Sequence, residues 1–273
     1  MPYKVLDIYR DLPRTNCGDC GKGSCFAFAS AVYLEGLALS SCPHLEPSAR
    51  AEMEARLAEG RARGEGRRPD SSEQALRFLL TKVAAADFEA LARGSGAGYD
   101  PGPPEALEFP FLGVPHRVTR TDVTASAGEA PTVWVKIFLL IYATRSSGAP
   151  PAGEWVAYRS LPNAVSKSKS FEAVGERIGG AFEGRLGELD AAAARLGGRP
   201  AGFGSPDRSY VFDALPRVPV LLLFWDRQEG FPSRASLLLD GGVLDSLDQE
   251  AIVFLAEAFG NRLTGKSLAE LVA

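Results

Sequence analysis

The sequence predicts an α+β protein, in which a small helical module that carries the cysteines precedes a larger domain of mostly antiparallel strands and helices. All four cysteines lie within the first 42 residues, and the C-terminal third is rich in strand-like segments without a regular strand–helix alternation. Between these parts, the stretch GEGRRPDSS has no large apolar side chain and consists of glycine, proline, serine and charged residues. We therefore predict a cluster-binding domain at residues 1–63, a linker at 64–72 and an α+β domain at 73–273.

Composition narrows the class of protein. The chain has 273 residues, 45% of them hydrophobic, which suffices for one sizeable core and a small appendage. Its formal net charge of −4 argues against a dedicated nucleic-acid binder. The start, MPYKVLDIYRD, has no apolar signal core, and the longest apolar run, Val133 to Ala143, is broken by Lys136 and is too short to span a bilayer. We expect a soluble, cytoplasmic protein without a membrane span.

The cysteines form the pattern C-x2-C-x4-C-x16-C-P, and Cys17, Cys20, Cys25 and Cys42 are the only four in the chain. Four thiolates are the complete ligand set of a [4Fe-4S] cluster or of a structural zinc. Before them, Tyr3 to Leu12 alternates apolar and charged residues and suits a short helix or turn that packs under the cluster.

The residues between the cysteines favour a cluster. Gly18, Gly21 and Gly23 let the loop take positive φ values and direct backbone N–H groups at sulfur atoms. Ser24 is a good N-cap for an apolar helix from Cys25 to Leu37, which places the Cys25 thiolate in the first turn, where the helix dipole favours negative charge.

Two other interpretations of the cysteines are weaker. Zinc accepts the same ligands and stays as the minor alternative, although its usual pattern is two compact C-x2-C pairs. Disulfides are disfavoured, because nothing marks the chain as secreted.

The stretch LPRTNCGDCGKGSCFAFASAVYLEG, followed by CPHL, resembles the four-cysteine [4Fe-4S] domain at the start of the large subunit of the corrinoid iron–sulfur protein, and of related electron-transfer subunits of anaerobic metabolism. The resemblance covers roughly residues 1–60. It implies that Cys17, Cys20, Cys25 and Cys42 bind one [4Fe-4S] cluster. The rest of the chain lacks the alternating strands and helices of that protein's barrel.

After Cys42, residues 46–63 are predicted to form a helix with Pro47 at its opening. A basic patch beside the linker either docks an acidic redox partner or, as we favour, belongs to a solvated linker; its members are Arg61, Arg63, Arg67 and Arg68.

The larger domain is predicted to open with two helices, Ser72 to Ala85 and Ala86 to Arg93. GSGAGYDPGPP then breaks the chain, and it lacks the preceding strand and following helix of a phosphate loop. LEFPFLGVPHRVTR gives one or two short strands, and we interpret His116 within it as a surface or capping side chain rather than a ligand. The length of the apolar run from Thr132 to Thr144 favours a buried helix.

Further along, GEWVAYRSLP is predicted as a strand, and SYVFDALP, VPVLLLFWD and ASLLLD as three more, the last two joined by a hairpin turn. The remaining predicted helices are Ser170 to Ala181, Gly184 to Leu196, Leu247 to Phe259 and Ser267 to Val272. GEWVAYRSLP, FDALPRVPVLLLFW and FPSRASLLLD are similar to a family of uncharacterised proteins from anaerobic prokaryotes, in which a domain of unknown function follows this cluster domain. That resemblance covers roughly residues 72–265 and implies the two-part architecture but no activity.

No catalytic residue is predicted in the larger domain. Polar residues near its strand ends form no nucleophile–base pair and are interpreted as surface charges at turns; they are Arg159, Asp226, Arg227, Glu229, Asp240 and Asp245. Trp155 and Trp225 are interpreted as core residues rather than as the walls of a flat ligand pocket.

Two functions remain, and a non-enzymatic role is favoured in both. The first is a one-electron carrier or redox accessory protein of anaerobic metabolism, whose partner is a redox protein, a corrinoid protein or another metalloenzyme. The alternative is a regulatory or interaction protein with a structural or oxygen-sensing cluster.

Overall fold

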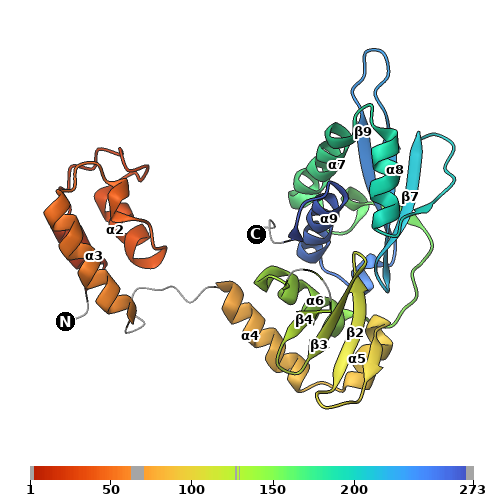
Figure 1. Cartoon of the computed structure of the whole chain (residues 1–273), viewed down its shortest axis with the longest axis horizontal. Helices are drawn as coiled ribbons and strands as arrows, with labels where there is room; N and C mark the ends of the chain where they lie inside the picture. The colour runs from red at the N-terminus through yellow and green to blue at the C-terminus, as the bar shows by residue number, and fades with distance from the viewer. Residues whose placement is uncertain (1–2, 63–70, 127, 129, 269–273) are drawn as a thin grey trace. The chain divides into compact units, whose positions relative to one another are not determined.

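The computed structural model describes residues 3–62, 71–126, 128 and 130–268. The chain divides into two compact units, Met1–Gln74 and Ala75–Ala273 (Figure 1). The first holds helices, and the second combines helices with two antiparallel sheets. The predicted α+β class, with a small helical part before a larger mixed one, is confirmed.

Unit 1 is built from α1 (Val5–Asp11), α2 (Cys25–Leu34) and α3 (Pro47–Ala62), with a 3-10 turn at Leu39–Ser41. Its core consists of apolar side chains from each helix, including Ile8, Phe28 and Met53. The predicted helix from Cys25 ends at Leu34 rather than Leu37, because Gly36 takes a left-handed φ of 74° and the Leu37 N–H turns back to the Ala31 carbonyl at 3.2 Å.

The predicted linker lies mostly outside the described residues. Of the predicted basic patch only Arg61 is described, and its guanidinium donates a hydrogen bond to the Val32 carbonyl at 3.3 Å. Arg61 thus ties α3 to α2, an intramolecular role that the sequence did not indicate.

Helix α4 (Ser71–Ala84) begins in the last residues of unit 1 and continues into unit 2. Helix α5 (Phe88–Ser95) follows, and Asp87 is its N-cap. The first sheet is an antiparallel meander in the order β1-β2-β3-β4 (Gly98–Asp100, Ala106–Phe111, Val114–Thr119 and Val123–Ala125). The stretch LEFPFLGVPHRVTR, predicted to give one or two short strands, forms two, β2 and β3. The edge strands β1 and β4 were missed, since each is short and β1 lies inside the glycine-rich stretch.

Helix α6 (Val133–Arg145) confirms the helical interpretation of the long apolar run. Thr132 caps it by accepting a hydrogen bond from the Val135 N–H. Most of its side chains are buried, and this burial explains why the helix has apolar residues on nearly every face.

The second sheet has the order β5-β9-β8-β7-β6 and is antiparallel throughout. Its strands are β5 (Trp155–Ala157), β6 (Arg199–Pro200), β7 (Arg208–Leu215), β8 (Val218–Trp225) and β9 (Arg234–Asp240). The predicted hairpin is confirmed by the β8–β9 pairing. The strand predicted at GEWVAYRSLP is shorter than expected, because the chain turns into a 3-10 helix at Tyr158–Ser160.

The helices of unit 2 that accompany this sheet are α7 (Ser168–Phe182), α8 (Leu186–Arg195) and α9 (Gln249–Leu263). Helix α7 contacts β9 and α9 (Figure 1). Gly175 permits the close approach to β9, since a Cβ there would lie 2.4 Å from the Ala235 carbonyl oxygen. The helix predicted from Ser267 to Val272 falls mainly outside the described residues.

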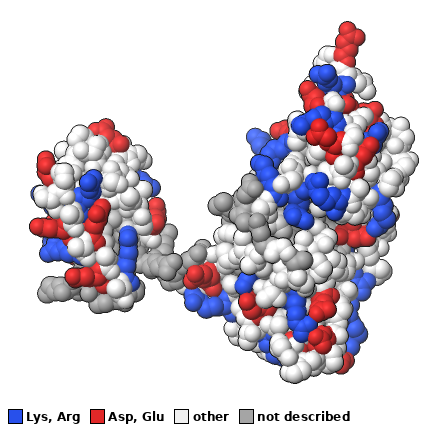
Figure 2. All heavy atoms as spheres, in the orientation of Figure 1, with Lys and Arg blue, Asp and Glu red and all other residues white. Residues whose placement is uncertain are grey.

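No helix within the described ranges combines the length and the apolar composition that a membrane crossing needs. On the face seen in Figure 2, cationic and anionic side chains intermingle over both units.

Candidate metal centre

The four cysteines are free thiols with graded exposure. Cys25 and Cys42 are buried in the core of unit 1, and Cys20 is half-buried against the same core. Cys17 is exposed. Three thiols therefore border one apolar cluster, and the fourth lies at its solvent side.

Cys25 is positioned by the start of α2. Ser24 caps the helix as predicted, with its hydroxyl accepting from the Ala27 N–H at 3.1 Å. Asn16 and Cys25 exchange two hydrogen bonds: the Cys25 N–H donates to Asn16 Oδ1 at 2.8 Å, and the Asn16 N–H donates to Cys25 Sγ at 3.4 Å. The sulfur thus lies at a helix N-terminus with an amide N–H directed at it, and both features stabilise a thiolate.

Two glycines of the loop are required for their backbone conformation, and none of them is required because a side chain would clash. Gly18 and Gly21 have φ values of 84° and 77°, and the Gly21 N–H closes a turn onto the Gly18 carbonyl at 2.8 Å. Gly23 has no such φ, contrary to prediction, and a Cβ on any of the three would meet no atom within 4 Å. Asn16 is also left-handed, at φ 53°, so the backbone before Cys17 is strained.

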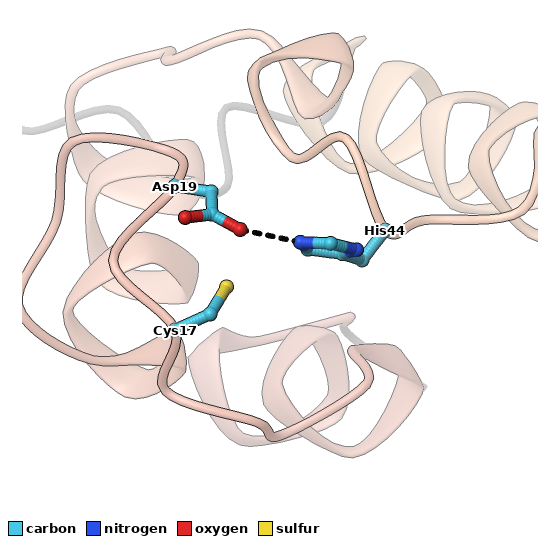
Figure 3. A group of neighbouring side chains, drawn as sticks. All are labelled: Cys17, Asp19 and His44. Atoms are coloured by element: carbon cyan, nitrogen blue, oxygen red, sulfur yellow. Dashed lines mark hydrogen bonds and ion pairs between the residues drawn. The ribbon is translucent and has the colours of Figure 1, made fainter.

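Asp19 and His44 join the two cysteine-bearing segments. Asp19 Oδ2 and His44 Nε2 lie 2.6 Å apart, and Cys17 Sγ completes a group whose ligand atoms are within 4.8 Å of one another (Figure 3). Hydrogen bonding from His44, and then from Cys17, holds the pKa of Asp19 below its usual value. Asp19 lies between Cys17 and Cys20, whereas His44 follows Cys42, so this contact spans the site.

This donor set fits an iron–sulfur cluster. Four thiols without disulfides are the complete ligand number, and the apolar core of unit 1 shields Cys25 and Cys42 from water. Zinc fits the same sulfur donors, and the Cys17–Asp19–His44 group adds nitrogen and oxygen donors that a zinc ion also accepts.

Sequence reasoning missed Asn16, Asp19 and His44. The available signals were local: asparagine tolerates left-handed backbone, and His44 directly follows the Cys-Pro pair. Their contacts with Cys25 and with each other depend on the folded loop.

Two residues of unit 2 correct the interpretation of its polar groups. His116 is buried, 3% exposed, rather than at the surface, and burial lowers its pKa. Asp240 is likewise 3% exposed and accepts backbone hydrogen bonds from Ala152, Gly153 and Gly242, so it organises the loop before β5 rather than lying at a surface turn.

The other predicted positions carry no shared site. Asp226 accepts from the Gly184 N–H at 2.8 Å, and Arg227 and Glu229 are exposed. Trp155 and Trp225 are half-buried, and Trp225 lies against the Arg234 guanidinium at 4.2 Å. Arg159 and Asp245 lie in 3-10 turns.

Residues 87–262, well over half of the chain, match the family described as "Domain of unknown function (DUF3786)". The chain belongs to this family. The DUF3786 match covers both sheets of unit 2 and begins after α4. No solved structure matches the chain.

A second family model, described as "Putative Fe-S cluster", matches residues 12–44, which include all four cysteines. This segment is also similar to part of the corrinoid/iron-sulfur protein large subunit of Moorella thermoacetica, with 41% identity over 58 residues, 21% of this chain and 13% of that protein. Similar values hold for acetyl-CoA decarbonylase/synthase complex subunit gamma of Methanothermobacter thermautotrophicus: 41% identity over 58 residues, again 21% and 13%. The subunit gamma of Methanocaldococcus jannaschii is 45% identical over 47 residues, 16% of this chain and 10% of its own.

The chain thus spans only about an eighth of the length of these relatives. What this DUF3786 protein shares with them is the cysteine segment, and the shared segment supports an iron–sulfur cofactor.

Proposed function

We propose that unit 1 binds one [4Fe-4S] cluster through Cys17, Cys20, Cys25 and Cys42. The observation that carries this proposal is that the segment matching the iron–sulfur family holds four free thiols, three of which border the core of unit 1. The dipole of α2 and the Asn16 N–H both favour a thiolate at Cys25.

We further propose a one-electron carrier or redox accessory protein of anaerobic metabolism. When bound, a [4Fe-4S] cluster supplies reversible one-electron transfer. Cys17 is exposed, so it brings one edge of the site to the surface, where a partner can approach. The similarity to subunits of the corrinoid/iron-sulfur protein and of the acetyl-CoA decarbonylase/synthase complex suggests a corrinoid protein or another metalloenzyme as that partner, with unit 2 as a docking or ligand-binding platform. Free thiols also suit the reducing cytoplasm.

Anaerobic purification followed by iron and sulfide analysis, and by EPR of the dithionite-reduced protein, tests the cofactor. We expect four irons and four sulfides per chain, as a single [4Fe-4S] cluster requires, and an EPR signal that reoxidation removes. One zinc per chain without sulfide would overturn the proposal.

The exposure of Cys17 also supports a second candidate function, that of an oxygen-sensing or structural cluster, because an exposed ligand gives oxidants access to the site. Redox titration separates the two functions. A carrier shows reversible reduction over repeated cycles, whereas a sensing or structural cluster is lost on oxidation or does not cycle.

A further inference from the structure

Unit 2 contains a cavity of about 300 Å³ at the N-terminal end of α6. His116 of β3 lines it on one side, and Arg262 and Lys266, at the end of α9 and just after it, line another. Thr132, the N-cap of α6, and Ser267 are the other polar side chains of the described lining. These elements are labelled in Figure 1.

The charge of this cavity is uncompensated. Its described lining includes no aspartate or glutamate, and within the described residues no carboxylate pairs with Arg262 or Lys266. By contrast, Arg177 and Arg208 of the same unit pair with Glu257 and Asp190. Among the residues that the structure describes, the two positive charges of the cavity therefore have no carboxylate partner.

Arg262 also has an orphan donor. Its Nε is fully buried and has no hydrogen-bond partner within the described part of the chain. A buried guanidinium N–H without an acceptor is costly. Because this Nε is closed to solvent, an anion in the cavity would meet the terminal nitrogens of the Arg262 guanidinium, and the orphan Nε bears on stability alone.

The other two walls add donors and an acceptor. Helix α6 has 13 residues, and the backbone N–H groups of its first turn and its dipole favour an anion beside Thr132. His116 Nδ1 donates to the Val114 carbonyl at 2.8 Å, which leaves Nε2 of the neutral ring as an acceptor. An anion that retains one O–H, as hydrogen phosphate does, matches both kinds of group.

We propose that this cavity binds an oxyanion of the phosphate class, either free phosphate or the phosphate group of a small monoester. Two cations and a helix N-terminus supply the donors that such a group accepts. The cavity is larger than one phosphate ion, so it has room for a small ester substituent. This site is independent of the cluster proposed for unit 1.

Calorimetric titration of the anaerobically purified full chain with inorganic phosphate, at constant ionic strength in chloride, tests the proposal. We expect saturable binding to one site. A parallel titration with glycerol 2-phosphate distinguishes the sources: tighter binding of the ester assigns the site to a monoester, and weaker binding assigns it to free phosphate. Absence of saturable binding in both titrations would overturn the proposal.

Variants locate the site. Arg262→Met keeps an unbranched apolar stem but removes the guanidinium, and it should weaken binding about tenfold or more. Lys266 is exposed, so Lys266→Gln should weaken binding about threefold. Arg227→Gln removes one exposed positive charge elsewhere in unit 2 and should leave the affinity unchanged. Equal losses in all three variants, or unchanged affinity in both Arg262→Met and Lys266→Gln, would contradict the assignment.

Stability gives a second readout that a merely structural Arg262 would not produce. Without phosphate, Arg262→Met should unfold at or above the wild-type temperature, because it removes the orphan donor. Phosphate at a concentration that saturates the wild type should raise its unfolding midpoint more than that of the variant, because the variant binds phosphate more weakly. Strong destabilisation of the phosphate-free variant would show that Arg262 serves packing instead.

Discussion

Asn16 and Cys25 are joined by hydrogen bonds in both directions, and this exchange explains the strained backbone that precedes Cys17. The Asn16 side chain satisfies the Cys25 N–H, while its own N–H reaches the sulfur. Both contacts require the left-handed conformation of Asn16. These two hydrogen bonds therefore help to set the conformation of the loop around the sulfurs.

Replacement of Cys20 by serine tests the ligand set at the scale of one atom. A serine hydroxyl is a harder and much less acidic donor than a thiol, so we expect most of the iron and sulfide to be lost. Iron and sulfide analysis with EPR measures this. Lys22→Gln, in the same loop, is the control and should retain full occupancy. An unchanged EPR spectrum in Cys20→Ser would remove Cys20 from the ligand set.

His44 is expected to act through its contact with Asp19. The 2.6 Å contact between them holds the Cys42 segment against the first cysteine loop, as groups around metal ligands commonly do. His44→Gln should therefore speed the loss of iron to a chelator about tenfold. Glu46→Gln, an exposed acid two residues further along, serves as the control. Equal chelation rates for wild type and His44→Gln would show that the contact does not brace the site.

At the scale of an element, α7 is held close to β9 by glycine. A Cβ on Gly175 would lie 2.4 Å from the Ala235 carbonyl oxygen, whereas one on Gly180 of the same helix meets nothing within 4 Å. We expect Gly175→Ala to destabilise unit 2 by about 1–3 kcal/mol through overpacking. Gly180→Ala should stabilise it by about 0.5–1 kcal/mol through helix propensity.

Urea unfolding followed by tryptophan fluorescence checks this pair, since all three tryptophans, Trp134, Trp155 and Trp225, belong to unit 2. Similar effects of the two substitutions would mean that α7 can move away from β9 at little cost.

Helix α8 is tied to β7 by a partly exposed carboxylate. Asp190 accepts from Arg208 at 2.7 Å and from Tyr210 at 2.5 Å. The Arg208 hydrogen bond, followed by that of Tyr210, lowers the pKa of Asp190 against the opposing effect of desolvation. Because the folded pKa lies below the unfolded value of about 3.9, the stabilisation is present above that pH and is lost as the pH falls through the folded pKa.

Asp190→Asn should therefore lower the stability of unit 2 at pH 7 by about 1 kcal/mol or less, given the solvent exposure of the pair. The difference from wild type should shrink as the pH falls below about 4. Urea unfolding by tryptophan fluorescence at several pH values measures it, with Glu188→Gln of the same helix as control. A difference independent of pH would assign the loss to packing rather than charge.

For the whole molecule, we expect the two units to depend differently on the cofactor. The core of unit 1 is small and includes Cys25 and Cys42 themselves, so ligation should supply much of its folding free energy. Unit 2 has its own extensive core and contains no cysteine. In the apo protein, or in Cys17→Ala, unit 1 should lose hydrogen-exchange protection while unit 2 keeps a cooperative thermal transition. Protection lost evenly across both units would show one integrated domain and would contradict the predicted linker.

The sequence by itself determined the features that rest on local chemistry. The spacing of four cysteines, the Ser24 cap, the apolar run of α6 and the alternation in β2 and β3 each follow from neighbouring residues, and the structure retains them. The α+β class followed because antiparallel strands need only short connections.

The tertiary structure alone decided which distant residues meet. His44 reaches Asp19 across 25 positions, and His116 lies in one cavity with Arg262, although the sequence marked the histidine as a surface residue and gave no reason to single out the arginine. The burial of Asp240 could not be predicted from the sequence either, since its partners Ala152 and Gly153 are 88 and 87 positions away. Local patterns fix the conformation of a segment, but the partners of a polar side chain depend on how whole elements pack, and that packing is a property of the complete chain.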